Sequence, residues 1–164
     1  MPGQIKLSAI IVSTVTRTDY IKNCIKSLAE QKTGVSFEVI LVLSGDGDFN
    51  TNFPFPDNII FKIIYVNDNN YCLKRNAGAK VATGGIIAFI DDDALANSGW
   101  IDAICKGFKR DWKIAGGYVE PNFEIDIPND LSGYERLIGG FNYLPRIGYS
   151  SETIIGCNMF LQRD

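Results

Sequence analysis

Short runs of consecutive apolar residues, rich in β-branched and aromatic side chains, recur along this chain. Runs of this kind, without alternation of polar and apolar positions, are typical of strands covered on both faces, as in a parallel sheet between helices. The runs that predict strands are Leu7 to Val12, Phe37 to Leu43, Ile59 to Val66 and Ile86 to Ile90. The last run continues directly into the three carboxylates of Asp91, Asp92 and Asp93.

Helices are predicted between these runs, where apolar residues recur at helical spacing. In the first helix Tyr20, Cys24 and Leu28 share one face. Thr18 or Asp19 is expected to cap its amino end, because both side chains can accept a hydrogen bond from a free backbone amide. The order strand, helix, strand then predicts parallel pairing.

A second helix is expected after the polar cluster 67–70, with Leu73, Ala77 and Val81 on its inward face. A third helix is expected after Asn97 or Ser98, either of which can cap it. Its predicted inward face consists of Ile101, Ile104, Cys105 and Phe108.

Two more strands are predicted near the end of the chain, at Ile114 to Val119 and Thr153 to Leu161. Between them, residues 120–151 contain three prolines and a possible short helix at Tyr134 to Ile138. This segment predicts a loose cover over one edge of the sheet. A length of 164 residues is enough for one domain with a sizeable core.

Composition and charge narrow the class of protein. The chain is 46% hydrophobic and 21% charged with a net charge of −3, which is typical of a folded globular protein and gives no basic surface for nucleic acid. The four cysteines are widely spaced, and the sequence has no signal peptide and no apolar run long enough to span a membrane. We therefore expect a cytoplasmic protein with no transmembrane segment, and contact with the cytoplasmic face of a membrane stays open.

The chain contains no histidine. This excludes a histidine-based hydrolase triad and a histidine-containing zinc site within the chain. Any chemistry is therefore expected to depend on carboxylates and cations.

The three aspartates after the fourth strand lie where open α/β sheets bind ligands, outside the carboxyl ends of the strands. Carboxylates about 4 Å apart repel by roughly 4 kcal/mol at an effective dielectric of 20, so this cluster needs a proton, a basic partner or a cation. Clustered carboxylate oxygens suit Mg²⁺ or Mn²⁺. The residues alone leave two interpretations open, a metal site or a solvated turn whose aspartates cap the next helix.

The segment Phe89 to Ala94 is followed by Trp100. It is one of a series of motifs, whose other members are Ile11 to Arg17 with Cys24 to Leu28, Phe37 to Val42, Leu73 to Gly78 with Ala82 to Gly85, Ala115 to Val119, and Gly156 to Phe160. In this order and at these separations, the motifs resemble those of the inverting glycosyltransferases of family 2, which have the GT-A fold. Phe89 to Ala94 with Trp100 matches the metal-binding D-x-D segment of that family and the tryptophan beyond it. The likeness covers essentially the whole chain.

The resemblance implies an α/β fold of the GT-A type, with a mainly parallel central sheet, helices on both faces and a short carboxyl-terminal part. It implies a single domain over residues 1–164. Residues 1–119 would form the nucleotide-sugar-binding core, and residues 120–164 would begin an acceptor-side region that is incomplete. The implied reaction is metal-dependent transfer of a sugar, with inversion, from a UDP- or GDP-linked donor to an unknown glycan, lipid or protein acceptor.

The resemblance also implies roles for individual residues. Asp93 would bind Mn²⁺ or Mg²⁺, Asp91 would lie near the ribose and, through water, the same metal, and Asp92 would lie beside the nucleotide sugar. Arg75 would reach the nucleotide or brace the aspartates, although it can also be a solvated helix cation. The first strand would flank the nucleoside with Ser13, Thr14 and Arg17, of which Thr14 and Arg17 can instead cap the first helix.

Two departures from the family pattern limit these expectations. The family usually has a base-holding aspartate after its second strand, but this chain has Leu43 and Ser44 there, with Asp46 as a substitute. The catalytic base of the family is expected beyond Asp164, so no catalytic residue is assignable. The short chain is therefore either a glycosyltransferase of uncertain activity or, as the alternative, a non-catalytic nucleotide-sugar-binding or interaction module.

Overall fold

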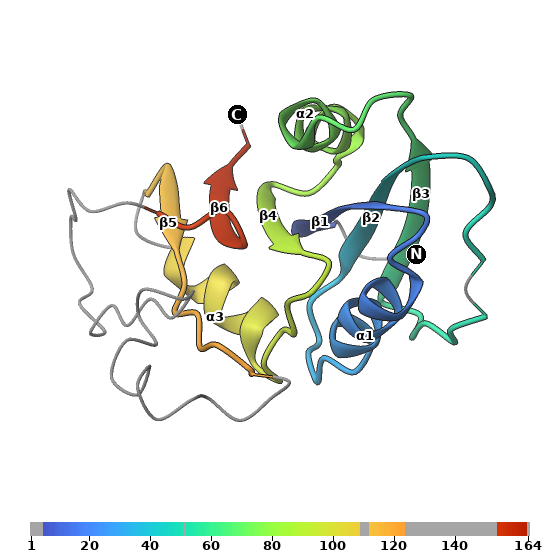
Figure 1. Cartoon of the computed structure of the whole chain (residues 1–164). Helices are drawn as coiled ribbons and strands as arrows, with labels where there is room; N and C mark the ends of the chain where they lie inside the picture. Colours follow the sequence, from blue (N-terminus) through green and yellow to red (C-terminus); the bar gives the residue numbers. More distant parts are fainter. Residues whose placement is uncertain (1–4, 51, 109–111, 124–153, 164) are drawn as a thin grey trace, which may run out of the picture.

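The computed structural model describes residues 5–50, 52–108, 112–123 and 154–163. Helices and strands alternate through the first two thirds of the chain, except that the second and third strands follow one another with no helix between them, as the hydrophobic pattern predicts (Figure 1). The elements are β1 (Leu7–Thr14), α1 (Thr18–Ala29), β2 (Phe37–Ser44), β3 (Ile59–Tyr65), α2 (Tyr71–Val81), β4 (Ile86–Asp91), α3 (Trp100–Gly107), β5 (Ile114–Gly116) and β6 (Asn158–Gln162).

The strands form one six-stranded sheet in the order β3-β2-β1-β4-β6-β5. The four strands β3, β2, β1 and β4 are parallel, whereas β6 is antiparallel to β4 and β5 is antiparallel to β6. The mainly parallel α/β sheet predicted from the sequence is therefore confirmed. The register pairs Val12 with both Val42 and Asp91, so β1, β2 and β4 end at the same edge of the sheet.

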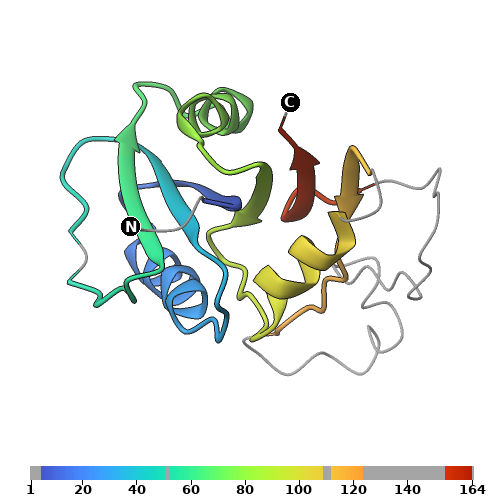
Figure 2. The same cartoon turned by 180° about the vertical axis from the view of Figure 1, so that it is seen from behind.

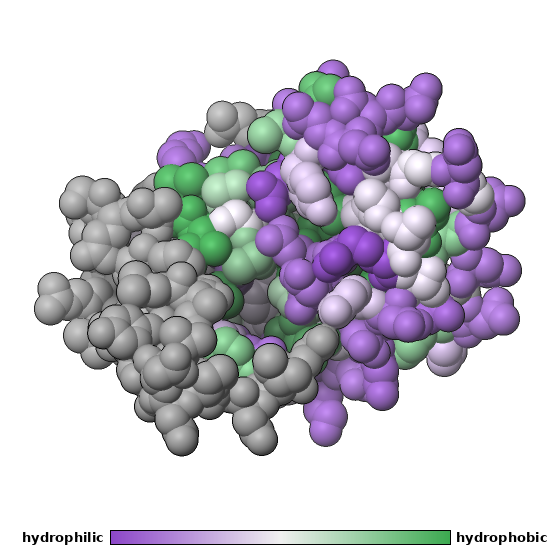
Figure 3. Space-filling view, in the orientation of Figure 1, coloured by the Kyte–Doolittle hydropathy of each residue, from purple (hydrophilic) through white to green (hydrophobic). Residues whose placement is uncertain are grey.

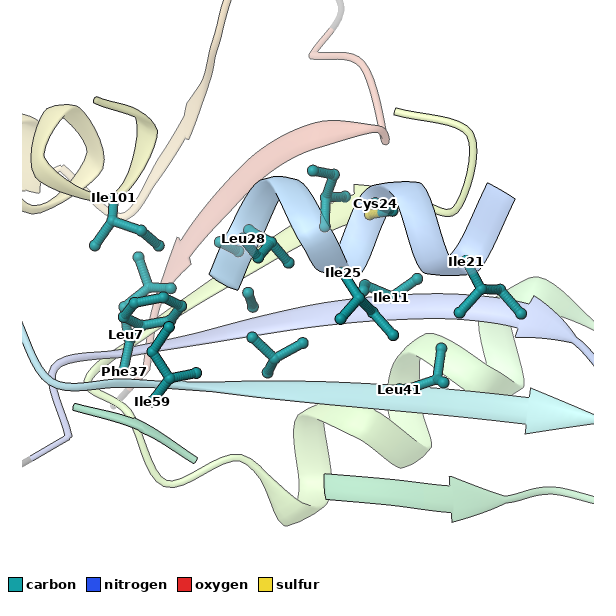
Figure 4. Packing of buried hydrophobic residues seen from close by; sticks show 14 of the residues in the cluster. Leu7, Ile11, Ile21, Cys24, Ile25, Leu28, Phe37, Leu41, Ile59 and Ile101 are labelled. Carbon is teal, nitrogen blue, oxygen red and sulfur yellow. The ribbon is translucent and has the colours of Figure 1, made fainter. Parts of the chain in front are cut away.

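Helices cover both faces of the sheet, as predicted. Helices α1 and α3 lie on one face and α2 lies on the other, which the two opposite views show (Figures 1 and 2). Figure 4 shows the α1 face, where Ile21, Ile25 and Leu28 point toward the side chains of β1 and β2. Successive residues of β1 alternate between the two cores, because strand side chains point to opposite faces.

The inward face predicted for α2 is wrong at two of its three residues. Ala77 packs against the core as predicted, but Leu73 and Val81 are exposed, and the side of the helix that packs on the sheet also carries Lys74 and Gly78. Gly78 lies so close to β1 that a Cβ there would be 2.6 Å from Ile10 Cγ2. The close approach of helix to strand therefore sets the rotation of α2, and it buries a lysine one turn before the glycine.

Two predicted helix caps need correction. Asn70, the last residue of the polar cluster 67–70, caps α2, because its side chain accepts hydrogen bonds from Cys72 N and Leu73 N. The residue at the cap position of α1 is Arg17 rather than Thr18 or Asp19, and at α3 it is Gly99 rather than Asn97 or Ser98. Neither makes a side-chain cap bond. Because α3 begins at Trp100, the interpretation in which the three aspartates cap the next helix is also wrong.

A carboxylate is buried in the middle of the sheet, near the amino ends of the strands. Glu38 Oε1 accepts hydrogen bonds from Ser8 Oγ at 2.6 Å and from Thr83 Oγ1 at 2.9 Å, and it also accepts one from Thr83 N. Its Oε2 accepts from Lys62 Nζ at 2.6 Å. Burial alone would raise the pKa of Glu38, but these donors outweigh it and lower the pKa to about 2. Glu38 therefore joins three strands to the segment after α2.

The last part of the chain is only partly described. The strand expected at Ile114 to Val119 is confirmed as the shorter β5, and the strand expected at Thr153 to Leu161 as β6. The cover predicted over residues 120–151, with its short helix, lies almost entirely outside the described residues. All four cysteines are free thiols, and Cys24 is the buried one. Within the described ranges, no helix has both the length and the apolar character needed to cross a membrane.

Candidate functional site

The carboxyl ends of β1, β2 and β4 bring polar and charged residues together at one edge of the sheet. Ser13 and Thr14 end β1, Ser44 ends β2 and Asp91 ends β4. Hydrophilic side chains dominate the right half of the face in Figure 3, whereas apolar groups gather left of centre. Because parallel strands present their carboxyl ends together, this edge is where a ligand is expected.

Asp92 is the buried member of the acidic cluster. Its side chain is 5% exposed and accepts two bonds from Arg17, from Nε at 2.7 Å and from Nη2 at 3.0 Å. Ser13 Oγ also donates to Asp92. The hydrogen bond with Asp92 raises the pKa of Arg17 above its already high ordinary value. Asp92 thus fixes the turn after β4 to the end of β1.

Asp91 pairs with Arg75, which reaches across from α2. Arg75 Nη2 donates to Asp91 Oδ1 at 2.9 Å, and the guanidinium lies 5.8 Å from the ring centroid of Phe89. Burial raises the pKa of Asp91, and the Arg75 charge opposes this shift. A Cβ at Gly156 would be 3.1 Å from both Nη atoms, so the glycine leaves room for the guanidinium. Arg75 Nε is buried and has no hydrogen-bond partner among the described residues.

Asp93 is the exposed member of the cluster. Its side chain is 58% exposed, and its Oδ2 accepts one hydrogen bond from Arg17 Nη2 at 3.1 Å. Among the described residues, no group of three or more histidine, cysteine, aspartate or glutamate side chains could hold a metal ion. This donor set still fits Mg²⁺ or Mn²⁺, because such ions often bind through one or two carboxylates and complete their shell with water and substrate phosphates.

The remaining predicted site residues are placed as follows. Thr14 Oγ1 is 2.9 Å from Thr16 Oγ1 in the turn before α1. Asp46 is exposed between Gly45 and Gly47, whose φ values of 103° and 118° are in the left-handed region that favours glycine. In the described part of the chain, no hydrogen bond or ion pair joins Asp46 to Arg17 or Arg75, the arginines that hold the three aspartates.

Sequence reasoning missed Lys74, which lies beneath this edge of the sheet. Its side chain is 0% exposed, and its Nζ donates to Ser13 O at 2.8 Å and to Ser44 Oγ at 3.1 Å. Burial lowers the pKa of Lys74, while Asp92 and Asp68 favour its charged form. Nothing in the apolar pattern of α2 indicates this role, because that pattern places Leu73 rather than Lys74 inside.

A second missed group stabilises the side of the site next to β6. Asn158 pairs with Ile90, the residue before Asp91. Its Oδ1 accepts from Trp100 Nε1 at 2.9 Å, and its Nδ2 donates to Tyr118 O at 2.9 Å. The tryptophan and asparagine of the family-like motifs are therefore structural partners that connect α3 and β6 beside the carboxylates.

Replacing Asp92 by alanine is expected to destabilise the fold by about 2 kcal/mol, because a buried acceptor of three hydrogen bonds is lost. Arg17 can return partly to water, which limits the cost. Chemical denaturation of the parent and the variant would measure this difference. A free energy of unfolding within about 0.5 kcal/mol of the parent, the range of ordinary surface changes, would contradict the structural role of Asp92.

Comparison with known proteins gives the family. The model of the family described as glycosyl transferase family 2 matches residues 9–164. Validoxylamine A glucosyltransferase of Streptomyces hygroscopicus subsp. jinggangensis (strain 5008) is 28% identical over 114 residues, which are 63% of this chain and 26% of that protein.

Two solved structures share the fold. The structure of TarS residues 1–349 from S. aureus in complex with UDP-GlcNAc has a TM-score of 0.60 and 18% identity, and it is matched over 77% of this chain and 38% of its own. The mannosyltransferase PcManGT from Pyrobaculum calidifontis, in complex with GDP-Man and Mn²⁺, has a TM-score of 0.58 and 14% identity, over 73% of this chain and 36% of its own. The chain thus spans less than half the length of each of these proteins. Because the family model covers nearly all of it, the chain belongs to glycosyl transferase family 2, and its sheet has the GT-A fold.

Proposed function

We propose that this chain binds a nucleoside-diphosphate sugar at the carboxyl ends of β1, β2 and β4, and that it is the donor-binding part of an inverting, metal-dependent glycosyltransferase. The observation that carries the proposal is the acidic turn after β4, where one carboxylate is exposed and its two neighbours are held by arginines. In this proposal residues 1–119 form the donor-binding core, and residues 120–164 begin the acceptor side. The acceptor is a glycan, lipid or protein, and the location is the cytoplasm or the cytoplasmic face of a membrane.

Asp93 would hold Mn²⁺ or Mg²⁺, with Asp91 next to it. When bound, such an ion acts as a Lewis acid on the diphosphate and stabilises the charge that the leaving group gains. The exposure of Asp93 supports this assignment, since within the described residues its carboxylate has only the Arg17 contact to give up. An exposed ion pair of this kind contributes about 1 kcal/mol or less, so its loss is a small cost.

The chain's own side chains prepare the site for an anionic ligand. Arg75 and Arg17 are planar donors that suit phosphate oxygens, and each is already oriented by a carboxylate. Ser13 and Thr14 place hydroxyl groups at the end of β1, where the Ser13 hydroxyl donates to Asp92.

The related structures support a nucleotide-sugar ligand without selecting its base. The TarS structure contains UDP-GlcNAc, whereas the PcManGT structure contains GDP-Man and Mn²⁺. For this chain a UDP- or GDP-linked donor is therefore proposed. Asp46, on its exposed turn, stays a proposed contact of the nucleotide.

Calorimetric titration of the chain with UDP and with GDP, each with and without Mn²⁺, tests the proposal. Binding of at least one nucleotide that requires the metal is the expected result. Absence of binding by both nucleotides in the presence of Mn²⁺ would overturn it. If binding is found, release of free sugar from UDP-GlcNAc or GDP-Man separates an enzyme from the non-catalytic binding module, because only the enzyme cleaves the donor.

A further inference from the structure

A chain of three polar side chains crosses the edge of the sheet between β1 and the loop after β3. Lys74 Nζ lies 2.8 Å from Ser13 O, 3.1 Å from Ser44 Oγ and 4.7 Å from the ring centroid of Tyr71. Ser44 Oγ in turn lies 2.7 Å from Asn69 Oδ1. The three groups around the Lys74 nitrogen are a carbonyl, a hydroxyl and an aromatic face, all of which suit a positively charged donor.

The direction of the hydrogen bonds in this chain is fixed by chemistry. An ammonium group only donates, so the hydroxyl of Ser44 accepts from Lys74. Ser44 is 2% exposed, and leaving a buried hydroxyl proton without an acceptor costs free energy. The hydroxyl of Ser44 therefore donates to Asn69. The acceptor on Asn69 is the carbonyl Oδ1, which leaves the amide Nδ2 at the other end of the side chain.

The amide nitrogen of Asn69 is therefore a donor with a fixed orientation. Asn69 is exposed, and its Nδ2 has no hydrogen-bond partner within residues 5–50, 52–108, 112–123 and 154–163. The backbone beside it is also held, since Asn70 N donates to Asp68 Oδ1 at 2.7 Å and Asn70 caps α2. Lys74 also holds the end of β1 through Ser13, whose hydroxyl donates to Asp92. Asn69 and the acidic turn after β4 are thus connected to the same edge of the sheet, at the carboxyl ends of β1 and β2.

We propose that Asn69, oriented by Lys74 through Ser44, is a binding residue that donates a hydrogen bond to a ring carbonyl of the donor's nucleobase. This inference rests on the proposed function, because it places the base beside β2 while the diphosphate lies at the acidic turn. A hydrogen-bond donor at this position distinguishes nucleobases that carry a ring carbonyl from those that do not. Uracil and guanine carry ring carbonyl oxygens, whereas adenine carries none.

Titration in Mn²⁺ with UDP, GDP, ADP and inorganic pyrophosphate tests this selection. The parent is expected to bind UDP or GDP at least about tenfold more tightly than ADP, a factor that one well-made hydrogen bond can supply. Asn69→Asp replaces the donor with an acceptor of the same shape. It is expected to remove that tenfold preference and to leave pyrophosphate affinity within about twofold, apart from the effect of the added charge. Asn67→Asp adds the same charge two residues away and is the matched control.

Ser44→Ala tests the orientation separately, because it leaves Asn69 in place but removes the group that fixes its amide. We expect this variant to keep about half of the tenfold preference for UDP or GDP over ADP on a logarithmic scale, so that a preference of roughly threefold remains. Equal binding of ADP by the parent would overturn the inference, and so would an Asn69→Asp variant that matches the Asn67→Asp control. A Ser44→Ala variant with full discrimination would overturn the role of the Lys74 and Ser44 connection. If the parent binds neither pyrophosphate nor any nucleotide in Mn²⁺, the proposed function itself fails.

Discussion

Replacing Asp93 by asparagine is expected to weaken metal-dependent binding of UDP or GDP by about 100-fold or more, while the fold stays intact. Loss of a residue that only supports a metal ligand typically costs 10- to 100-fold in metal affinity, so loss of the ligand itself should reach the upper end of that range. The free energy of unfolding should change by about 1 kcal/mol or less, because Asp93 is 58% exposed and has one ion pair with Arg17. Calorimetry and chemical denaturation on the same preparation would measure both quantities.

The combination of these two results is the informative outcome. Asp57→Asn is the matched control. Asp57 is exposed and precedes the amino end of β3, whereas the candidate site lies at the carboxyl ends of the parallel strands. It should change neither nucleotide affinity nor stability. An Asp93→Asn variant that binds nucleotide as the parent does, in the presence of Mn²⁺, would remove Asp93 from the metal site. A variant that unfolds would show that the exposed carboxylate has a structural role that its ion pair with Arg17 does not predict.

The strands, and the place of the candidate site at their carboxyl ends, could be predicted because both depend on local patterns. Buried parallel strands require unbroken apolar runs, and the run at Ile86 to Ile90 is β4 in the structure. The carboxyl end of such a strand is a ligand edge for topological reasons, so Asp91 could be placed there before the fold was known. The sequence also indicated that the aspartates need counter-charges, and the structure supplies Arg17 and Arg75.

Arg75 was expected to brace the aspartates, and it pairs with Asp91. The other residues that support the site could not be predicted, because their partners are distant in the sequence. Arg17 and Asp92 are 75 residues apart, and Lys74 and Ser13 are 61 apart. The apolar spacing of α2 favoured Leu73 as an inward residue. The contact of Gly78 with β1 and β2 decided the rotation instead, and periodicity carries no information about so close an approach. Polar residues that are buried for their hydrogen bonds are therefore the part of this site that only the fold reveals.

The second large effect concerns Glu38, at the end of the sheet away from the candidate site. Its side chain is 0% exposed and accepts hydrogen bonds from three residues, Ser8, Lys62 and Thr83. Glu38→Gln keeps the shape but removes the charge, and it places an amide N–H opposite one of these donors. We expect it to lower the free energy of unfolding at pH 7 by about 3 kcal/mol, because hydrogen bonds to charged groups contribute more than neutral ones.

The pH dependence of the free energy of unfolding separates the loss of the Glu38 charge from a packing defect, because a packing defect does not depend on pH. The pKa of Glu38 is lowered from 4.5 to about 2 in the folded chain, so the unfolded chain takes up the proton first as the pH falls. The stabilisation is therefore complete above about pH 5 and is lost as the pH falls from about 4.5 toward 2, which corresponds to about 3 kcal/mol in total.

Urea denaturation between pH 7 and pH 3 should show the free energies of unfolding of the parent and of Glu38→Gln converging as the pH falls. Glu30→Gln is the control, because Glu30 is exposed and 3.9 Å from Lys26, and it should follow the parent throughout. A stability difference between parent and Glu38→Gln that stays constant over this range would mean that the charge of Glu38 is not what stabilises the junction of β1, β2 and β3 with the end of α2.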